Sequence, residues 1–304
     1  MDKPLVSVIM PAYNAELYIS EAIKSIINQT FQNWELIIIN DGSTDATEKI
    51  ILDFERKDKR IKYLFQENGK QGKARNLGIQ QSRGEYIAFL DADDLWVENK
   101  LVIQVNYLIT NTEIDLIFSQ GYSLNQGNPI DFDIIVKPIW NINDLPLFIQ
   151  KNQIPILSVV VKKRCLDNVS NFIEDLDIQN VEDYHLWLKL LIKQFMYTSI
   201  SDRLFYYRIH SDQNTFNNNN TFLPIVKMFR LLYYENKILN CEKILVTRLK
   251  WMLFDSKANE EATQLIVIIL KSANKYLAQL IAFVLKMPSC RTRTKMIFKI
   301  ASWI

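Results

Sequence analysis

Cysteine is scarce in this 304-residue sequence, which contains Cys165, Cys241 and Cys290 and no others. Their number is odd, and no two of them stand at the spacing of a structural zinc site. These facts exclude a disulfide framework and a cysteine-based zinc site. They predict free thiols in a reducing compartment.

Long apolar runs are also missing. No stretch reaches the ~18 consecutive apolar residues of a transmembrane helix, and the N-terminal MDKPLVSVIM lacks the basic and apolar regions of a secretory signal. The composition, 48% hydrophobic and 23% charged, is typical of a soluble globular protein with one large core or two smaller ones. We therefore expect a cytoplasmic protein.

Charge is distributed unevenly, although the net charge is only +2. Asp and Glu outnumber Lys and Arg by 29 to 22 in residues 1–216, whereas Lys and Arg outnumber the acids by 14 to 5 in residues 217–304. An acidic body of net −7 thus precedes a basic tail of net +9. The polar run NNNN at 217–220 favours a linker, so we expect two domains, 1–216 and 217–304.

The basic tail has the pattern of several helices rich in Leu, Ile and Lys. Near its end, apolar residues alternate with cations: Ile297, Phe298, Ile300 and Trp303 stand among Arg291, Arg293, Lys295 and Lys299. This pattern suits an interfacial helix on an anionic membrane surface. It suits equally well a helical region that packs on the body or contacts another subunit.

Short apolar runs alternate with helical periodicity in the first hundred residues. Strands are predicted at 5–10, 35–40, 61–65 and 86–90, with amphipathic helices after the first three. This alternation is typical of an α/β fold with a mainly parallel sheet and helices on both faces. Further along, strands are predicted at 116–124 and 154–164 and a helix at 181–193. We expect Asn14 to cap the first helix and Ser43 or Thr44 the second.

Polar clusters follow three of the predicted strands, at Pro11–Asn14, Asp41–Asp45 and Asp91–Asp94. In parallel sheets, ligands bind beyond the carboxyl ends of the strands, so these clusters are expected to converge on one edge. In an extended chain Asp91 and Asp93 would point the same way, with their Cα atoms roughly 6–7 Å apart. The cluster could be a turn in which Asp94 starts the next helix, or a seat for Mg²⁺ or Mn²⁺.

Other charged residues have two interpretations each. Lys70 and Lys73 could meet an anion or form a solvated face, whereas Arg75, near the helix start, is a better candidate for an anionic or nucleotide contact. No GxxxxGK[ST] phosphate loop is present. Glu182 and Asp183 open a predicted helix, where acids are favoured in any case. His210, beside Arg208, could be a ligand or a packing residue.

Taken together and in order, these segments resemble the family 2 inverting glycosyltransferases, which have the Rossmann-like GT-A fold. The resemblance covers about residues 5–212 and rests on VSVIMPAYNAELYISEAIKSIINQTFQNWELIIINDGSTD, GKARNLGI, GEYIAFLDADDLW, VEDYHLWLKL and YYRIH. It implies that a nucleotide-sugar, with a UDP-sugar favoured, donates one sugar to a hydroxyl of a glycan or lipid-linked acceptor. It implies no nucleic-acid partner.

The resemblance also implies roles for single residues. The nucleotide would be bordered by Pro11, Ala12, Tyr13, Asn14, Asp41, Arg75, Asp91 and Ala92, with the Tyr13 ring near the base and Asp41 at the base edge. Asp93 and His210 would bind Mn²⁺ or Mg²⁺, and Arg208 would lie in a loop over the diphosphate. Asp183 would be the catalytic base, with Glu182 beside it.

The sequence departs from the family pattern in several places. The segment NVSNFIEDL lacks a glycine often found there, and Lys189 replaces a common arginine. No Q-x-x-R-W motif is present, which favours transfer of single sugars over processive synthesis of a polymer. Two other classes stay open: a non-catalytic sugar-nucleotide-binding subunit and a sugar nucleotidyltransferase, although the glycine-rich start of the latter is replaced by MPAYNAE.

Overall fold

The computed structural model describes residues 4–125, 127–210, 221–235 and 260–273. The chain divides into two compact units, Met1–Asn217 and Asn218–Ile304. The polar run at 217–220 and the amphipathic end of the tail, residues 291–303, lie outside the described residues, so the membrane role of the tail stays a prediction.

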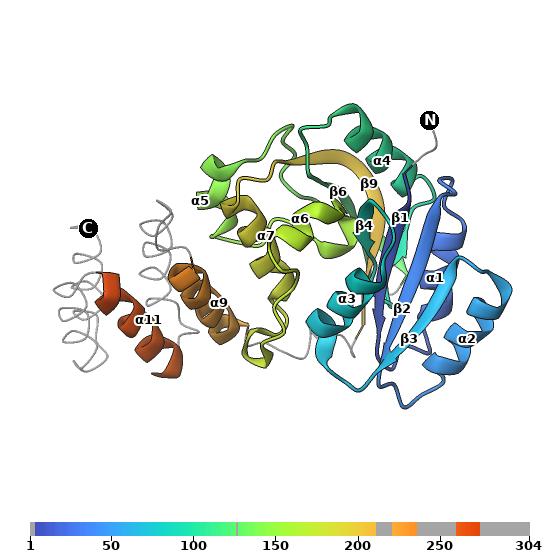
Figure 1. Ribbon diagram of the computed structural model, residues 1–304, viewed down its shortest axis with the longest axis horizontal. Coiled ribbons are helices and arrows are strands. Elements are labelled where there is room, and N and C mark those ends of the chain that lie inside the picture. Colours follow the sequence, from blue (N-terminus) through green and yellow to red (C-terminus); the bar gives the residue numbers. More distant parts are fainter. Residues whose placement is uncertain (1–3, 126, 211–220, 236–259, 274–304) are drawn as a thin grey trace. The chain divides into compact units, whose positions relative to one another are not determined.

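The first unit contains a mixed sheet (Figure 1). Its strand order is β3-β2-β1-β4-β8-β6-β9-β5, and β7 pairs with β6. The strands are β1 (Val6–Ala12), β2 (Trp34–Asp41), β3 (Ile61–Gln66), β4 (Tyr86–Phe89), β5 (Leu95–Trp96), β6 (Leu116–Asn125), β7 (Asn128–Phe132), β8 (Val160–Lys162) and β9 (Tyr197–Ile209). Strands β3, β2, β1 and β4 run parallel, as predicted. Strands β5, β7 and β8 run antiparallel to their neighbours, and only β8 coincides with a predicted strand. The predicted α/β fold class is confirmed.

Helices connect these strands. The first unit has α1 (Ile19–Ile27), α2 (Thr47–Lys57), α3 (Lys70–Gln81), α4 (Lys100–Thr110), α5 (Leu145–Phe148), α6 (Lys163–Asn168) and α7 (Glu182–Ile192), with short 3₁₀ turns η1 (Ile142–Asp144), η2 (Ile156–Ser158) and η3 (Leu176–Ile178). The second unit contains α9 (Phe222–Glu235) and α11 (Glu260–Ala273), whose residues Lys227 and Glu261 form an ion pair at 3.5 Å. No described helix is long and apolar enough to cross a membrane.

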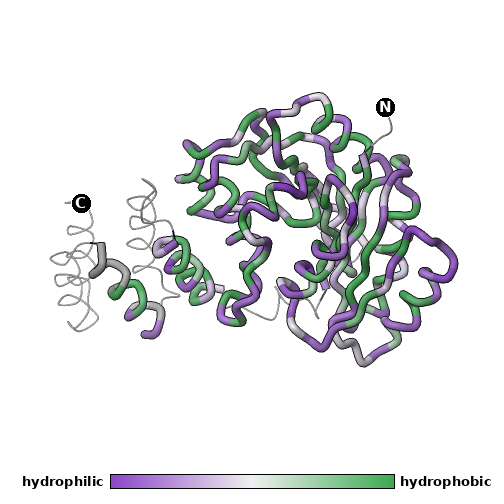
Figure 2. The backbone as a smooth tube through the Cα atoms, in the orientation of Figure 1, coloured by the Kyte–Doolittle hydropathy of each residue, from purple (hydrophilic) through white to green (hydrophobic). Residues whose placement is uncertain are grey.

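The core lies on both faces of the central strands, because every residue of β1 and β2 is buried. These strands are largely hydrophobic along their length (Figure 2). Side chains alternate between the two faces of a strand. Val8 and Met10 belong to the cluster that includes the inner face of α1. Ile9 points the other way, toward α3, where a Cβ added to Gly78 would lie 2.5 Å from its Cγ2. Helices therefore cover both faces, and the polar side chains of β1 and β2 lie near the ends of these two strands.

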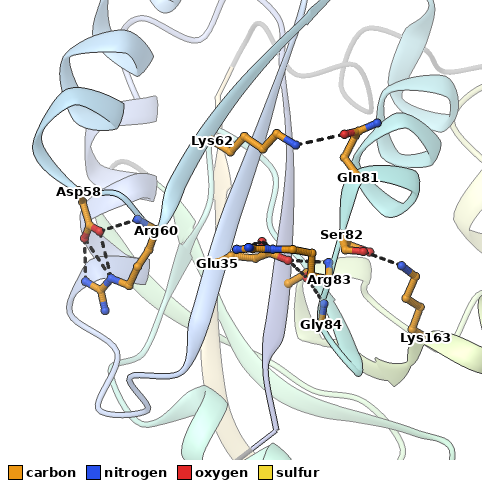
Figure 3. A network of polar contacts seen from close by, with 10 residues as sticks. Glu35, Asp58, Arg60, Lys62, Gln81, Ser82, Arg83, Gly84 and Lys163 are labelled. Atoms are coloured by element: carbon orange, nitrogen blue, oxygen red, sulfur yellow. Dashed lines mark hydrogen bonds and ion pairs between the residues drawn. The ribbon is translucent and has the colours of Figure 1, made fainter.

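A polar network closes the amino-terminal edge of the sheet (Figure 3). The buried Glu35 carboxylate accepts hydrogen bonds from Ser7 Oγ at 2.6 Å and from the Arg83 backbone N at 2.7 Å. Gly84 N donates to Ser7 Oγ at 2.8 Å, and Lys163 Nζ donates to Ser82 O at 2.7 Å. Burial raises the pKa of Glu35, but the bonds from Ser7 and Arg83 outweigh it and lower the pKa overall.

This network predicts a pH-dependent contribution to stability. The folded-state pKa of Glu35 is depressed, so its contribution is present above the unfolded-state pKa and is lost as the pH falls. Replacing Glu35 with Gln should therefore lower the free energy of unfolding by about 1 kcal/mol at neutral pH and by less near pH 4. Urea unfolding at both pH values measures the difference, and equal losses at the two values would contradict the assignment.

Candidate active site

The loops after β1 and β2 are held together by side-chain hydrogen bonds. Asn14, which has φ +47°, accepts a bond from Thr44 N at 2.8 Å through its Oδ1, and its own N donates to Ser43 Oγ at 3.0 Å. The prediction that Asn14 caps α1 is wrong, because its side chain binds the neighbouring loop and Tyr18 takes the N-cap position. Beside this junction the Tyr13 side chain is 52% exposed, so its ring is accessible to a ligand, whereas Ala12 is buried.

The predicted cap of α2 is also wrong. Neither Ser43 nor Thr44 caps this helix, which begins at Thr47. Asp45 lies at the helix start instead, and its Oδ1 accepts a bond from Thr47 N at 3.0 Å. The Asp45 Oδ2 atom accepts a second bond, from Glu16 N at 3.1 Å. The NDGSTD stretch thus joins two loops at the carboxyl edge, and its hydroxyl groups are used in that junction.

Asp41 lies at the end of β2 and is 4% exposed. Its Oδ1 accepts bonds from Gln66 Nε2 at 2.6 Å and Gly69 N at 2.7 Å, and its Oδ2 accepts one from Lys70 N at 3.0 Å. The carboxylate therefore fixes the turn between β3 and α3. Contacts of Asp41 and Tyr13 with a nucleotide base stay predictions. Tyr13 is exposed and can meet a base directly, whereas Asp41 is buried.

The acidic cluster after β4 contains three different environments. The side chains of Asp91 and Asp93 are 24% and 27% exposed, whereas Asp94 is buried. The prediction that Asp94 starts a helix is wrong: it precedes β5, and α4 begins only at Lys100. Its Oδ1 accepts a bond from Arg208 N at 2.8 Å. Asp94 thus joins the cluster to the end of β9.

Arg208 and His210 approach this cluster from a distant part of the chain. Arg208 Nε donates to Asp93 O at 2.8 Å, and His210 Nε2 lies 3.0 Å from Asp93 Oδ2. The Tyr18 ring packs against His210 with 4.6 Å between the ring centroids. Burial and the Asp91 charge raise the pKa of Asp93, an effect that His210 partly offsets. The structure thus brings together Asp93, Arg208 and His210.

Arg75 connects two acidic groups in the interior. It is 2% exposed; its Nη2 lies 2.8 Å from Asp91 Oδ1 and its Nη1 lies 2.8 Å from Glu182 Oε1. Burial acts to lower the pKa of Arg75, but the two carboxylates outweigh it and raise the pKa, so the guanidinium stays charged. This cation holds the start of α7 against the acidic cluster. A contact between Arg75 and a base or phosphate stays a prediction.

Asp183 lies in the first turn of α7 with its side chain partly exposed. Its Oδ1 accepts a bond from Tyr184 N at 2.6 Å and its Oδ2 accepts one from Asn152 Nδ2 at 3.1 Å. Burial and the Glu182 charge raise the pKa of Asp183 to about 7, although Arg75 acts to lower it. Burial and the neighbouring acid outweigh the usual effect of a helix start. A carboxyl group with this pKa suits a general base at neutral pH.

Two further residues of α7 are His185, which is buried, and Lys189, which is half-buried. His185 is buried, and neither ring nitrogen has a hydrogen-bond partner among the described residues. Burial and Lys189 lower the pKa of His185 to about 3, so the ring is neutral. Lys189 Nζ donates to Val169 O at 2.6 Å and Asn171 O at 2.9 Å. Lys189, which replaces an expected arginine, therefore holds the loop before α7.

A divalent cation fits one part of this arrangement. Within the described ranges, no three His, Cys, Asp or Glu side chains gather closely enough to hold a metal ion by themselves. Asp93 and His210 supply a carboxylate oxygen and an imidazole nitrogen that lie 3.0 Å apart and are partly exposed. Protein sites for Mg²⁺ commonly use one or two such ligands and take the others from substrate phosphates and water. The pair is therefore suited to a cation that arrives with a phosphate ligand.

Sequence reasoning did not identify Asn152. It lies in the irregular stretch between α5 and η2, where no periodicity or motif marks it. Its contact with Asp183 links residues 31 positions apart, and a single sequence contains no signal for such a pair.

Comparisons with known proteins give consistent results. The model of the family described as Glycosyl transferase family 2 matches residues 7–155. The chain is 37% identical over 193 residues to the UDP-Glc:alpha-D-GlcNAc-diphosphoundecaprenol beta-1,3-glucosyltransferase WfgD of Escherichia coli, which covers 63% of this chain and 71% of that protein. It is 35% identical over 211 residues to the putative teichuronic acid biosynthesis glycosyltransferase TuaG of Bacillus subtilis. This match covers 68% of this chain and 80% of that protein.

Coverage of other relatives is lower. The chain is 39% identical over 167 residues to an uncharacterized glycosyltransferase of Haemophilus influenzae, which is 55% of this chain and 65% of that protein. It is 36% identical over 226 residues to an uncharacterized glycosyltransferase of Rickettsia bellii. This match covers 71% of this chain but only 30% of the length of that protein.

Solved structures share the fold. TarS 1–349 of S. aureus in complex with UDP-GlcNAc superposes with a TM-score of 0.68 at 22% identity, over 88% of this chain and 80% of that chain. The mannosyltransferase PcManGT of Pyrobaculum calidifontis in complex with GDP-Man and Mn²⁺ superposes with a TM-score of 0.61 at 18% identity. The superposition covers 99% of this chain and 87% of that chain. At these identities the likeness establishes the fold alone.

Proposed function

Because this chain belongs to glycosyl transferase family 2, we propose that it transfers a single sugar from a nucleotide-sugar to a hydroxyl group of an acceptor. One observation carries the proposal: Arg75 contacts both Asp91 of the Asp91–Asp94 cluster and Glu182, the neighbour of Asp183. This contact supports a site in which the cluster would bind the diphosphate and the metal, and Asp183 would be the base. The proposed donor is a UDP-sugar, and the proposed acceptor is a glycan or a lipid-linked glycan of surface polysaccharide or glycolipid biosynthesis. The names of WfgD and TuaG support this choice.

The donor would bind at the carboxyl edge of β1, β2 and β4. The Tyr13 ring is exposed there and would pack on the base. The other proposed nucleotide contacts are Pro11, Ala12, Asn14, Asp41, Arg75, Asp91 and Ala92. Several of these also shape the edge, since Asn14 and Asp41 hold its loops and Arg75 holds α7.

Asp93 and His210 would hold Mn²⁺ or Mg²⁺. When bound, such a cation offsets the negative charge that grows on a departing diphosphate. Arg208 fixes the loop around Asp93 through the Asp93 carbonyl and Asp94, and it brings a further positive charge to the same place.

Asp183 would act as the general base. It would take the proton of the acceptor hydroxyl while that oxygen forms a bond to the anomeric carbon and the bond to the nucleoside diphosphate breaks. A displacement in one step inverts the anomeric centre. Glu182 raises the basicity of Asp183 through its charge, and Arg75 keeps Glu182 in place.

The pKa of Asp183 predicts the pH dependence of transfer. The unprotonated carboxylate is the reactive form, and its pKa of about 7 means that this form accumulates as the pH rises. We expect kcat/KM to rise about tenfold from about pH 6 to about pH 8 and then to level off. Initial rates in buffers of constant ionic strength measure this rise. A kcat/KM that stays constant or falls from about pH 6 to about pH 8 argues against Asp183 as the base.

The function is tested with a panel of nucleotide-sugars and a GlcNAc-diphospho-lipid acceptor, with Mn²⁺ or with EDTA. The proposal predicts release of a nucleoside diphosphate and a product heavier by one sugar. With pyrophosphate added in place of the acceptor, formation of a nucleoside triphosphate and a sugar 1-phosphate from a nucleotide-sugar would instead indicate a nucleotidyltransferase. Binding without turnover of any donor would indicate a non-catalytic sugar-nucleotide-binding subunit.

A further inference from the structure

Asn152 contacts the carboxyl group to which the proposed function assigns proton transfer. It belongs to the segment that joins α5 to η2, whereas Asp183 belongs to α7. The Asn152 Nδ2 atom donates to Asp183 Oδ2 at 3.1 Å. The Asn152 side chain is partly buried, which shields this bond from competing water.

A second hydrogen bond fixes which end of the Asn152 amide faces Asp183. Asn152 Oδ1 accepts a bond from the backbone N of Ile154 at 3.1 Å. Rotating the amide by 180° would place an oxygen against the carboxylate and a nitrogen against the N–H group, and both bonds would be lost. Ile154 is 1% exposed, so its backbone is anchored in the core. The amide N–H group is therefore held toward Asp183.

The segment and the helix are also joined outside this contact. The Tyr184 hydroxyl, on the residue after Asp183, donates to Phe148 O at the end of α5. Tyr184 and Phe148 are both buried. The distance between Asn152 and Asp183 is thus set by packed structure on both sides.

The surroundings of Asp183 combine charges of both signs. Glu182 on the same helix repels the ionised form, and Arg75 from α3, itself paired with Asp91, attracts it. Tyr184 N donates to Oδ1 and Asn152 Nδ2 to Oδ2, so each carboxylate oxygen accepts a bond from the described part of the chain. Each oxygen keeps a further lone pair for an acceptor hydroxyl.

We propose that Asn152 is a positioning residue that orients the Asp183 carboxylate toward the acceptor hydroxyl and stabilises its ionised form. The inference rests on the proposed function of Asp183 and extends it to a residue from a different part of the chain. A donor that bonds the ionised form lowers the pKa of a carboxyl group, so removing Asn152 raises that of Asp183.

The test measures the titration of Asp183 directly, by NMR of protein labelled with ¹³C in the aspartate carboxyl groups. The Asp183 signal is assigned from its absence in Asp183→Asn. We expect a midpoint near pH 7 in the wild type and a rise of roughly one pH unit in Asn152→Ala. Asn152→Ser keeps a donor and an acceptor, and should shift the midpoint less. Gln153→Ala is the matched control, because Gln153 donates to backbone carbonyls; it should leave the midpoint unchanged.

A second variant provides an independent test in case Asn152→Ala does not fold. Asn152→Asp preserves the size of the side chain and places a second carboxyl group beside Asp183, so the pair should share a proton and titrate at a still higher pH. In both variants, the pH at which kcat/KM falls on the acidic side should move by the same amount as the NMR midpoint. The donor is the one identified in the panel, and the affinity for UDP should stay the same.

The outcomes distinguish an error in the inference on Asn152 from an error in the proposed function of Asp183. If Asn152→Ala lowers the rate equally at every pH and leaves the Asp183 midpoint unchanged, Asn152 has a structural role and the inference is wrong. If the midpoint moves but Asp183→Asn keeps full turnover, the contact is real and the proposed base is wrong.

Discussion

Replacing Asp183 with asparagine is expected to lower kcat for sugar transfer by about 10²–10⁴-fold while UDP affinity stays within about twofold. The substitution preserves the shape of the side chain and its acceptor for Tyr184 N, and it removes the oxygen that takes the proton. Turnover with saturating donor and calorimetric UDP titration measure the two quantities. The matched control is Asp167→Asn, because Asp167 is exposed at the end of α6 and should be silent.

The same variant loses the bond from Asn152 to Oδ2, but it should gain stability relative to the wild type as the pH rises. The folded-state pKa of Asp183 is raised to about 7, so the protein favours the protonated form and loses stability as the pH rises through the interval between the unfolded and folded values. Asparagine avoids that loss, so the Tm difference should grow from about pH 5 to about pH 8. Undiminished transfer by Asp183→Asn would remove the base from the account, whatever its Tm.

Replacing Arg75 with methionine is expected to lower the free energy of unfolding by about 3–5 kcal/mol and to abolish transfer. The guanidinium is buried and contacts both Asp91 and Glu182, so its removal leaves these two carboxylates without their counter-ion. Chemical unfolding measures the first effect. Arg83→Met is the matched control, since the Arg83 side chain is 78% exposed and its ion pair with Glu35 should contribute little.

A compensated variant distinguishes charge from packing. Adding Asp91→Asn and Glu182→Gln to Arg75→Met removes the unpaired charges and should recover most of the lost stability. Transfer should stay absent, because Asp183 then lacks the charges that hold and tune it. A triple variant as unstable as Arg75→Met would indicate that Arg75 acts through its packing against Phe172 rather than through its charge.

The parallel half of the sheet could be predicted from sequence because β1, β2 and β4 are buried along their length and read as continuous apolar runs. The strands β5 and β7 could not, since one has two residues and the other is largely exposed. Strand β9 was missed for another reason: its middle residues are exposed, and its last residues carry the polar groups that point to a site.

The resemblance proposes the site residues as a set, but it does not give their contacts. The resemblance singles out Asp93 and His210 as candidate metal ligands, a role that stays a prediction, and the fold places them 3.0 Å apart. Local patterns were misleading for Asn14 and Asp94, whose side chains bind distant partners instead of capping helices. The link from Arg75 to Glu182 joins residues 107 positions apart and depends on tertiary packing.

The central claim is that the carboxyl edge of the sheet is a nucleoside-diphosphate site completed by a divalent cation at Asp93 and His210. Thermal unfolding with UDP, in Mn²⁺ and in EDTA, tests it most directly. The account predicts that UDP raises the Tm in Mn²⁺, that EDTA removes most of this rise, and that Asp93→Ala removes it in either buffer. A Tm that no nucleoside diphosphate raises in Mn²⁺ would contradict the claim.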